Sequence, residues 1–426
     1  MLNWIKVTLI LCLFGLLREI RPSEPFVSDF LVEWRNITNE QLQREIYPVG
    51  TYSYLAQLVL VFLITDFLRF KPVIILSGLS GITVYCILLW TSSIKWLQAS
   101  QFFYGMYMAT EVAYYTYIYA KVDPKKYPLV TSCTRIASLT GRFLSGVSSQ
   151  LLIHFKFMDY RELNYITLTA QILATFWALW LPPVKYGIYF HRRISTINIP
   201  VDKSSYKNSE KRTFTSNLIE ASSLILKHSK AAYSRPKVIA WSALYAVALA
   251  LFVQAQTYIQ ILWRYIQKEQ SNPVLYNGAA EAATTLLGAG AAYIASYDRQ
   301  SFSPALSSAI QGIALFLTTY ISNVFVSYAG YVVMGVMFHY IITLASAKIA
   351  SQLIDDSCFG LIFGINTLLG VALQSLLTYI LLQNLEFHIT THYYIVSGLF
   401  ITLATCWLVG WILHIAHNKK QNVNSN

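Results

Sequence analysis

The sequence predicts an all-α membrane protein in which twelve helices cross the bilayer in two groups of six. Of its 426 residues, 55% are hydrophobic and only 12% are charged. Soluble proteins carry about 25% charged residues, so this chain has too little polar surface to be one. Apolar runs of roughly 20 residues, the length that spans a membrane, recur along the chain. One long polar segment, 185–237, divides them into two sets.

The apolar runs define the predicted spans in order. Those before the polar segment are 3–21, 51–68, 72–92, 97–120, 128–154 and 163–184. Those after it are 238–263, 277–297, 304–324, 326–350, 358–383 and 391–415. The expected domains are an N-terminal half 1–184, a linker 185–237, a C-terminal half 238–416 and a tail 417–426. The linker carries a short amphipathic stretch near Leu218–Leu226.

Lysine and arginine predict the orientation of these spans. One set of loops, which includes the linker, holds most of them, whereas the opposite loops hold few. Cytoplasmic loops carry the excess of basic residues, so both termini and the linker are expected in the cytoplasm. Lys6 followed by an apolar run is also typical of a signal peptide, but no small-residue cleavage site follows it. A retained first span is therefore favoured.

The same orientation places the segment 22–50 outside the cell. It contains Asn36-Ile37-Thr38, the only glycosylation sequon of the chain. Glycosylation requires an external position, so the sequon and the basic-residue pattern agree. Asn36 is the predicted glycosylation site.

Several classes of function find no support in the sequence. The net charge of +12 resides in loops, where it indicates topology and not nucleic-acid binding. The five cysteines fall singly inside apolar runs, as small buried side chains do, so neither disulfides nor metal ligation is expected. His388 and His392 have metal-ligand spacing, but an interfacial position is favoured. Nucleotide-binding and hydrolase motifs do not occur, so neither an enzyme nor a cofactor is expected.

Charged residues inside the predicted spans are the candidates for function. A charge at the centre of a bilayer costs about 2.5–3.5 kcal/mol and is retained where it faces a polar cavity or a partner. Those to explain are Glu24, Glu111, Arg135, Arg142, Glu281 and Lys348. Twelve spans in two halves around a cytoplasmic linker is the plan of major facilitator transporters, which bind substrate between the halves.

Glu24 lies between two prolines in RPSEPF (21–26). Proline removes a backbone donor and disturbs a helix. Broken helices often line the sites of transporters, which would make Glu24 a ligand. The alternative is that the segment 22–26 ends the first span at the outer interface, where a charge costs little. The residues alone favour neither reading.

Glu111 in span four shares a helical face with Tyr114, three residues on. A carboxylate beside an aromatic ring suits a cation, since ring faces add cation–π attraction. A cavity position is favoured, although an ion pair with Arg135 on the next span is open and compatible with it.

Glu281 begins span eight among small residues that permit close helix packing. Packing does not explain its charge, so a site role is open. Lys348 lies near the inner end of span ten, where extension to the interface is the preferred explanation.

Seven strings, in order, resemble the animal reduced folate carrier and thiamine transporter family. They are RPSEPF (21–26), TYSYL (51–55), TDFLRFKPVIILSG (65–78), EVAYYTYIY (111–119), YIQILW (258–263), YNGAAEAATTLLGA (276–289) and FGLIFGINT (359–367). The resemblance extends from about residue 10 to 415. It implies the major facilitator fold and uptake of a water-soluble vitamin at the plasma membrane.

The resemblance also implies a preference between substrates. Folate carriers move a dianion with basic residues, whereas thiamine transporters move a cation with carboxylates and aromatic residues. Glu111 and Gln374 stand where the folate carrier has arginine and lysine, and so match the thiamine branch. Glu24, Glu111 and Tyr114 would then contact thiamine, with Arg135 holding Glu111.

Other positions depart from the thiamine branch. Gly50 replaces a tryptophan, Thr257 an asparagine, Gly335 a basic residue and Lys348 a glutamine. Two alternatives therefore stay open. One is folate transport with Arg135, Arg142 and Lys348 on the substrate, and the other is a diverged paralogue that does not transport.

Overall fold

The computed structural model describes residues 3–122, 126–184, 214–269, 275–298, 303–353 and 359–424. These residues form helices joined by short loops, and no strand occurs among them. The expected all-α class is therefore confirmed. The first part of the linker, 185–213, lies outside the described residues.

The described residues of the N-terminal half form seven long helices. They are α1 (Asn3–Glu19), α4 (Tyr47–Phe67), α5 (Lys71–Trp90), α6 (Ile94–Ala109), α7 (Glu111–Lys121), α8 (Tyr127–His154) and α9 (Tyr160–Ala178). Between α1 and α4 lie the 3-10 turn Glu24–Phe26, α2 (Val27–Arg35), α3 (Asn39–Gln41) and a π-helical turn, Leu42–Ile46.

The described residues of the C-terminal half form six helices. They are α11 (Pro236–Glu269), α12 (Asn277–Ala295), α13 (Ser303–Tyr320), α14 (Val324–Ala350), α15 (Phe359–Thr378), which a π-helix (Tyr379–Asn384) extends, and α16 (Ile389–Asn424). The amphipathic stretch of the linker belongs to α10 (Phe214–Tyr233). Helix α16 runs well past the expected boundary at residue 415, through most of the expected tail.

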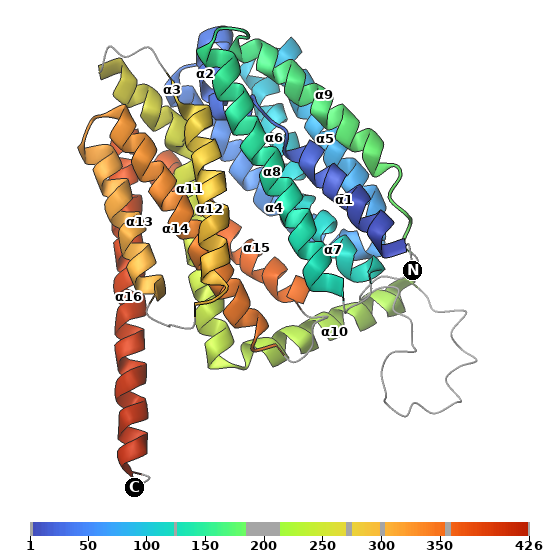
Figure 1. Ribbon diagram of the computed structural model, residues 1–426, viewed down its shortest axis with the longest axis vertical. Coiled ribbons are helices and arrows are strands. Elements are labelled where there is room, and N and C mark those ends of the chain that lie inside the picture. Colours follow the sequence, from blue (N-terminus) through green and yellow to red (C-terminus); the bar gives the residue numbers. More distant parts are fainter. Residues whose placement is uncertain are drawn as a thin grey trace.

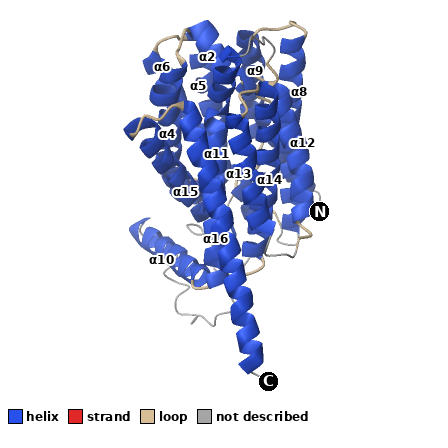
Figure 2. Cartoon of the chain, turned by 90° about the vertical axis from the view of Figure 1, so that its left-hand side faces the viewer, coloured by secondary structure: helices blue, strands red, loops and turns tan. Residues whose placement is uncertain are grey.

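The long helices run side by side in one bundle (Figures 1 and 2). Helices α2 and α3 lie at one end, and α10 lies across the other, where α16 also projects beyond the bundle (Figure 1). We call these the α2 end and the α10 end. The two halves meet where α8 packs on α12 and α4 packs on α15.

Five helical segments of the described chain are long and apolar enough to cross a membrane. They are Lys71–Trp90, Pro236–Lys268, Val324–Ala350, Gly360–Asn384 and Ile389–Leu413. Two of the predicted spans are shortened by breaks. Helix α1 has 17 residues and stops at Glu19, and span four divides at Thr110 into α6 and α7. The count of twelve spans stays a prediction.

Small residues allow the two halves to approach closely at α8 and α12. A Cβ on Gly146 would lie 2.7 Å from the carbonyl oxygen of Gly278 and 2.8 Å from the backbone nitrogen of Ala282. Only glycine leaves room for backbone contact of this kind. The stretch of small residues that begins α12 is thus an interface between the halves.

Candidate functional site

A cavity of about 340 Å³ lies between the two halves. The N-terminal half lines it from the end of α1 and from α4, α5, α6 and α8, and the C-terminal half from α11, α12, α14 and α15. Four candidate residues line it: Glu24, Arg142, Glu281 and Gln374. It also has aromatic walls, which include Tyr54, Tyr85, Tyr104, Phe252 and Phe338.

Glu24 reaches the cavity because the first span is broken and not merely ended. Helix α1 stops at Glu19, and the chain resumes in the turn Glu24–Phe26 and then in α2. The carbonyls freed by the break are bound by the other half: Gln260 donates to the Glu24 oxygen at 2.8 Å and Asn277 to the Pro25 oxygen at 2.9 Å. The broken segment is therefore stabilised by the C-terminal half and forms part of the cavity wall.

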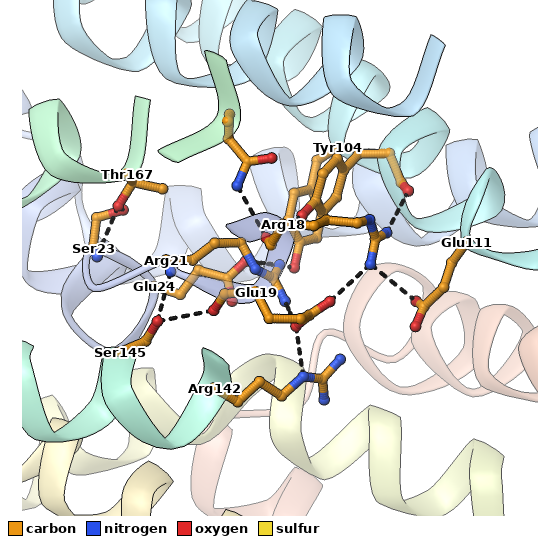
Figure 3. A network of polar contacts seen from close by, with 12 residues as sticks. Arg18, Glu19, Arg21, Ser23, Glu24, Tyr104, Glu111, Arg142, Ser145 and Thr167 are labelled. Atoms are coloured by element: carbon orange, nitrogen blue, oxygen red, sulfur yellow. Dashed lines mark hydrogen bonds and ion pairs between the residues drawn. The ribbon is translucent and has the colours of Figure 1, made fainter. Parts of the chain in front are cut away.

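Glu19 is the centre of a buried network of charges (Figure 3). Its carboxylate accepts from Nη1 of Arg18 at 2.7 Å, from Nη2 of Arg21 at 2.7 Å and from Nε of Arg142 at 2.6 Å. Its side chain is 2% exposed. Three arginines thus share one carboxylate away from solvent, where such bonds are strong.

Two further carboxylates complete this network. Arg21 pairs with Glu24, whose Oε1 also accepts from the Tyr104 hydroxyl at 3.2 Å. Arg18 lies 3.8 Å from Glu111. We call the set the Glu19 network: Arg18, Glu19, Arg21, Glu24, Glu111 and Arg142. Local pairing of Arg18, Glu19 and Arg21 follows from their spacing, but the approach of Arg142 from α8 has no signal in the sequence.

Glu281 lies outside the Glu19 network, on α12. Its Oε1 accepts from the Tyr331 hydroxyl at 2.6 Å, and that hydroxyl accepts from Gln256 at 3.2 Å. No ion pair joins Glu281 to another residue of the described chain. It is therefore a cavity carboxylate without a cationic partner in that part of the protein.

Gln374 on α15 also lines the cavity, and its side-chain oxygen is buried without a hydrogen bond from the described residues. Gly50 and Thr257, two of the positions that depart from the thiamine branch, line it as well. Thr257 is engaged with its own helix, since its hydroxyl donates to the Val253 oxygen at 2.7 Å.

The structure places three sequence candidates away from the cavity lining: Glu111, Tyr114 and Arg135. Tyr114 is 2% exposed, and its hydroxyl donates to the Leu11 oxygen of α1 at 3.0 Å. Its ring packs beside Phe14, with 5.4 Å between the centroids. Tyr114 thus joins α7 to α1.

The expected pairing of Glu111 with Arg135 is also corrected. The cation beside Glu111 is Arg18, which comes from α1 and not from the next span. His392 is fully buried inside the protein, with Nε2 3.0 Å from the side-chain nitrogen of Gln254. Gly335 packs on Thr284, and Lys348 is not among the described residues that line the cavity.

Polar contacts hold the halves together at the α2 end. Arg264 pairs with Asp29, and Arg44 lies 2.8 Å from Glu386. Gln150 donates to the Leu275 oxygen at 2.9 Å. These contacts come from α2, the π-helical turn and α8 on one side. On the other side they come from α11, the residues just before α12 and the loop between the α15 extension and α16. These contacts therefore join the two halves at the α2 end.

Comparison with known proteins places the chain among membrane carriers. The reduced folate carrier family model matches residues 2–395. Thiamine transporter 2 of Homo sapiens is 34% identical over 96% of this chain and 90% of its own. Folate transporter 1 of Caenorhabditis elegans is 31% identical over 100% of this chain and 95% of its own.

Solved structures establish the fold. A POT family transporter in complex with a thioalcohol-conjugated peptide superposes with a TM-score of 0.65 at 11% identity, covering 94% of this chain and 95% of that chain. The human organic anion transporter MFSD10 superposes with a TM-score of 0.56 at 13% identity, covering 95% of this chain and 98% of that chain. These likenesses show the major facilitator fold, and the family match is the more specific finding. The chain belongs to the reduced folate carrier family.

Proposed function

We propose that this protein is a plasma-membrane uptake carrier that moves a thiamine-like vitamin cation by alternating access. Its family membership supports transport of a vitamin, since relatives include thiamine transporters of human and mouse and a folate transporter of Caenorhabditis elegans. In this fold the two halves rock around a site between them, which is where the cavity lies.

Glu281 is the observation that carries the choice of a cation. The Glu19 network contains three arginines and three glutamates, so its formal charges cancel. Glu281 adds one negative charge to the cavity wall with no ion pair to a described cation. A bound cation would restore neutrality there, whereas a bound dianion would add to the repulsion.

The aromatic walls of the cavity support the same choice. Tyr85, Tyr104, Phe252 and Phe338 line it from α5, α6, α11 and α14. Aromatic faces attract cations and stack on flat rings, at about 0.5–2 kcal/mol per contact. A positively charged heteroaromatic ring therefore fits this lining. Glu24 stays a second candidate ligand, although Arg21 and Tyr104 already engage it.

The orientation is part of the proposal. Basic loops favour the α10 end as the cytoplasmic side, with both termini inside. The closed α2 end then faces outward, so the conformation is one with the external gate shut. Asn36 is exposed at this end and is a proposed glycosylation site. Loss of a glycosidase-sensitive mass shift in Asn36→Gln would test it, and an unchanged shift would reject it.

Reduced folate is the second candidate substrate, and Arg142 is what favours it. This arginine lines the cavity, so it can meet a carboxylate of a folate. Of the other basic residues considered for folate, Arg135 and Lys348 do not line the cavity among the described residues. A receptor that binds without transport is the remaining class, and flux measurements separate it from both carriers.

Paired uptake tests the proposal directly. Cells expressing the chain would receive labelled thiamine or labelled 5-methyltetrahydrofolate, with surface expression measured in parallel. We expect thiamine uptake that Glu281→Gln abolishes and that the exposed control Glu45→Gln leaves intact. Uptake of folate alone, or full thiamine uptake by Glu281→Gln at equal surface expression, would reject a cation site at Glu281.

A further inference from the structure

Arg142 forms its hydrogen bond through Nε, whereas Arg18 and Arg21 form theirs through the terminal nitrogens. Arg18 and Arg21 are 4% and 6% exposed, and both terminal nitrogens of each are bound while their Nε atoms are not. Arg142 is 42% exposed, and its described hydrogen bond leaves from Nε alone, to Glu19. Figure 3 shows its two terminal nitrogens directed away from that carboxylate.

We propose that these two terminal nitrogens of Arg142 form an anion-binding subsite, so that the ligand of the cavity carries a carboxylate or phosphate group together with its cationic ring. The terminal nitrogens of a guanidinium form a planar fork that matches both groups with two parallel hydrogen bonds. This inference rests on the proposed transport function, because it specifies the ligand of the same cavity.

Glu19 makes the fork a preorganised one. It holds Nε of Arg142 at 2.6 Å and is itself fixed by Arg18 and Arg21. A long arginine side chain normally loses conformational freedom when it binds a ligand, and that loss weakens binding. Here the orientation is set before the ligand arrives. Glu19 is thus a positioning residue for Arg142 and has no contact of its own to offer the anion.

The cationic and anionic subsites lie close together on the cavity wall. Arg142 is one helical turn before Gly146, and a Cβ on Gly146 would lie 2.8 Å from the backbone of Ala282, the neighbour of Glu281. Arg142 and Glu281 line the same cavity, yet no ion pair joins them. Each therefore has capacity for a ligand group, and a dipolar ligand satisfies both at once.

A role in neutralising Glu19 does not by itself explain Arg142. Glu19 already has two arginines at 2.7 Å, and each of those is buried with its terminal nitrogens engaged. A third arginine that served only the fold would be expected to engage its terminal nitrogens likewise, since donors left without a hydrogen bond are costly at depth. The open fork at the cavity points to a ligand.

Three probes with the same two rings test the subsite on the full-length protein. They are thiamine, thiamine acetic acid, which adds a carboxylate, and thiamine monophosphate, which adds a phosphate. Binding would be measured on purified protein in lipid nanodiscs by displacement of labelled thiamine. We expect at least one anionic probe to bind tenfold or more tightly than thiamine, as charge-assisted hydrogen bonds allow. The probe that binds more tightly shows whether the subsite takes a carboxylate or a phosphate.

Variants of Arg142 test whether this residue causes the tighter binding of an anionic probe. Arg142→Gln should remove the gain of the anionic probe over thiamine, and Arg142→Lys should lose most of that gain because lysine lacks the fork. The matched control Arg161→Gln, on α9 outside the cavity, should keep the preference. Equal binding of all three probes to the wild-type protein, or an equal loss for all three in Arg142→Gln, would overturn the subsite.

The outcome is separable from that of the proposed function. Thiamine uptake by cells without any preference for an anionic probe would leave the carrier standing and remove the subsite. Anion-selective binding that depends on Arg142, with no uptake of any probe, would establish the subsite and reject the carrier.

Discussion

Glu19 is the residue on which the cavity charges depend. Taking a charge from water to a buried site costs several kcal/mol, and the cost is offset only where partners and hydrogen bonds are complete. Glu19 receives a hydrogen bond from each of Arg18, Arg21 and Arg142. Its loss would therefore leave three cations under-compensated at once. This is a larger penalty than the loss of any one arginine.

Glu19→Gln should accordingly destabilise the protein by roughly 3–5 kcal/mol, the cost of breaking a buried ion pair from one side. Thermal unfolding in detergent would show it as a large fall in midpoint, with Glu45→Gln as an exposed control. Adding Arg142→Gln to Glu19→Gln removes one stranded cation, so the double variant should recover part of the loss. A Glu19→Gln protein as stable as the wild type would contradict the role of Glu19 as the centre of the network.

Some site residues can be predicted from sequence, and others cannot, for a physical reason. Glu24 and Glu281 are conspicuous because charge is rare in apolar runs, and both line the cavity. Arg142 is equally conspicuous, but its partner Glu19 is 123 positions away, and no local pattern joins them. Ion pairs between helices depend on how the helices pack, which composition and spacing do not encode.

At the scale of single elements, helical periodicity identifies shared faces but not what those faces meet. Glu111 and Tyr114 are three residues apart and do lie on one helix, α7. That helix begins after Thr110, and its Tyr114 meets α1 and does not line the cavity. Pro22 and Pro25 signal the break that follows Glu19, whereas Thr110 carries no such signal.

The contact of α8 with α12 gives a prediction at this scale. Gly146→Ala would place a Cβ 2.7 Å from the Gly278 carbonyl oxygen, which is backbone and cannot rotate away. The helices would have to separate, at a cost of about 1–3 kcal/mol. We expect a lower thermal midpoint and weaker ligand binding, since Arg142 and Glu281 flank this contact.

Gly290→Ala is the matched control for that change. Nothing lies within 4 Å of a Cβ at Gly290, on α12, so alanine should be neutral or stabilising by up to about 1 kcal/mol through its helix propensity. Equal stability of Gly146→Ala and Gly290→Ala would mean that the halves tolerate a wider spacing at α8 and α12. The close approach would then not be required.

At the scale of the whole molecule, the contacts at the α2 end form the closed gate of the proposed transport cycle. Arg264 pairs with Asp29, which is fully buried, and lies 3.3 Å from Glu33. Asn277 also donates to Asp29, at 3.1 Å. Arg264 and Asn277 belong to the C-terminal half and the two acids to the N-terminal half. Separation of the halves at this end must therefore expose Asp29 to water.

Removal of Arg264 should open this gate. In the closed state Arg264→Gln leaves the Asp29 carboxylate buried without its cation, a cost of about 3–5 kcal/mol, whereas water solvates Asp29 when the end opens. The equilibrium should therefore shift toward the open form by tenfold or more. Thr51 lines the cavity on α4, so in the proposed orientation a cysteine introduced there reports on access from outside.

The measurement is the rate at which a membrane-impermeant maleimide labels Thr51→Cys on intact cells, after subtraction of the signal from the native cysteines. Arg264→Gln should raise that rate at least tenfold. The control Arg161→Gln should not, because Arg161 lies over the Trp34 ring and bridges no gap between the halves. An unchanged rate in Arg264→Gln would show that α8 and α12, together with the other contacts of this end, hold the gate without it.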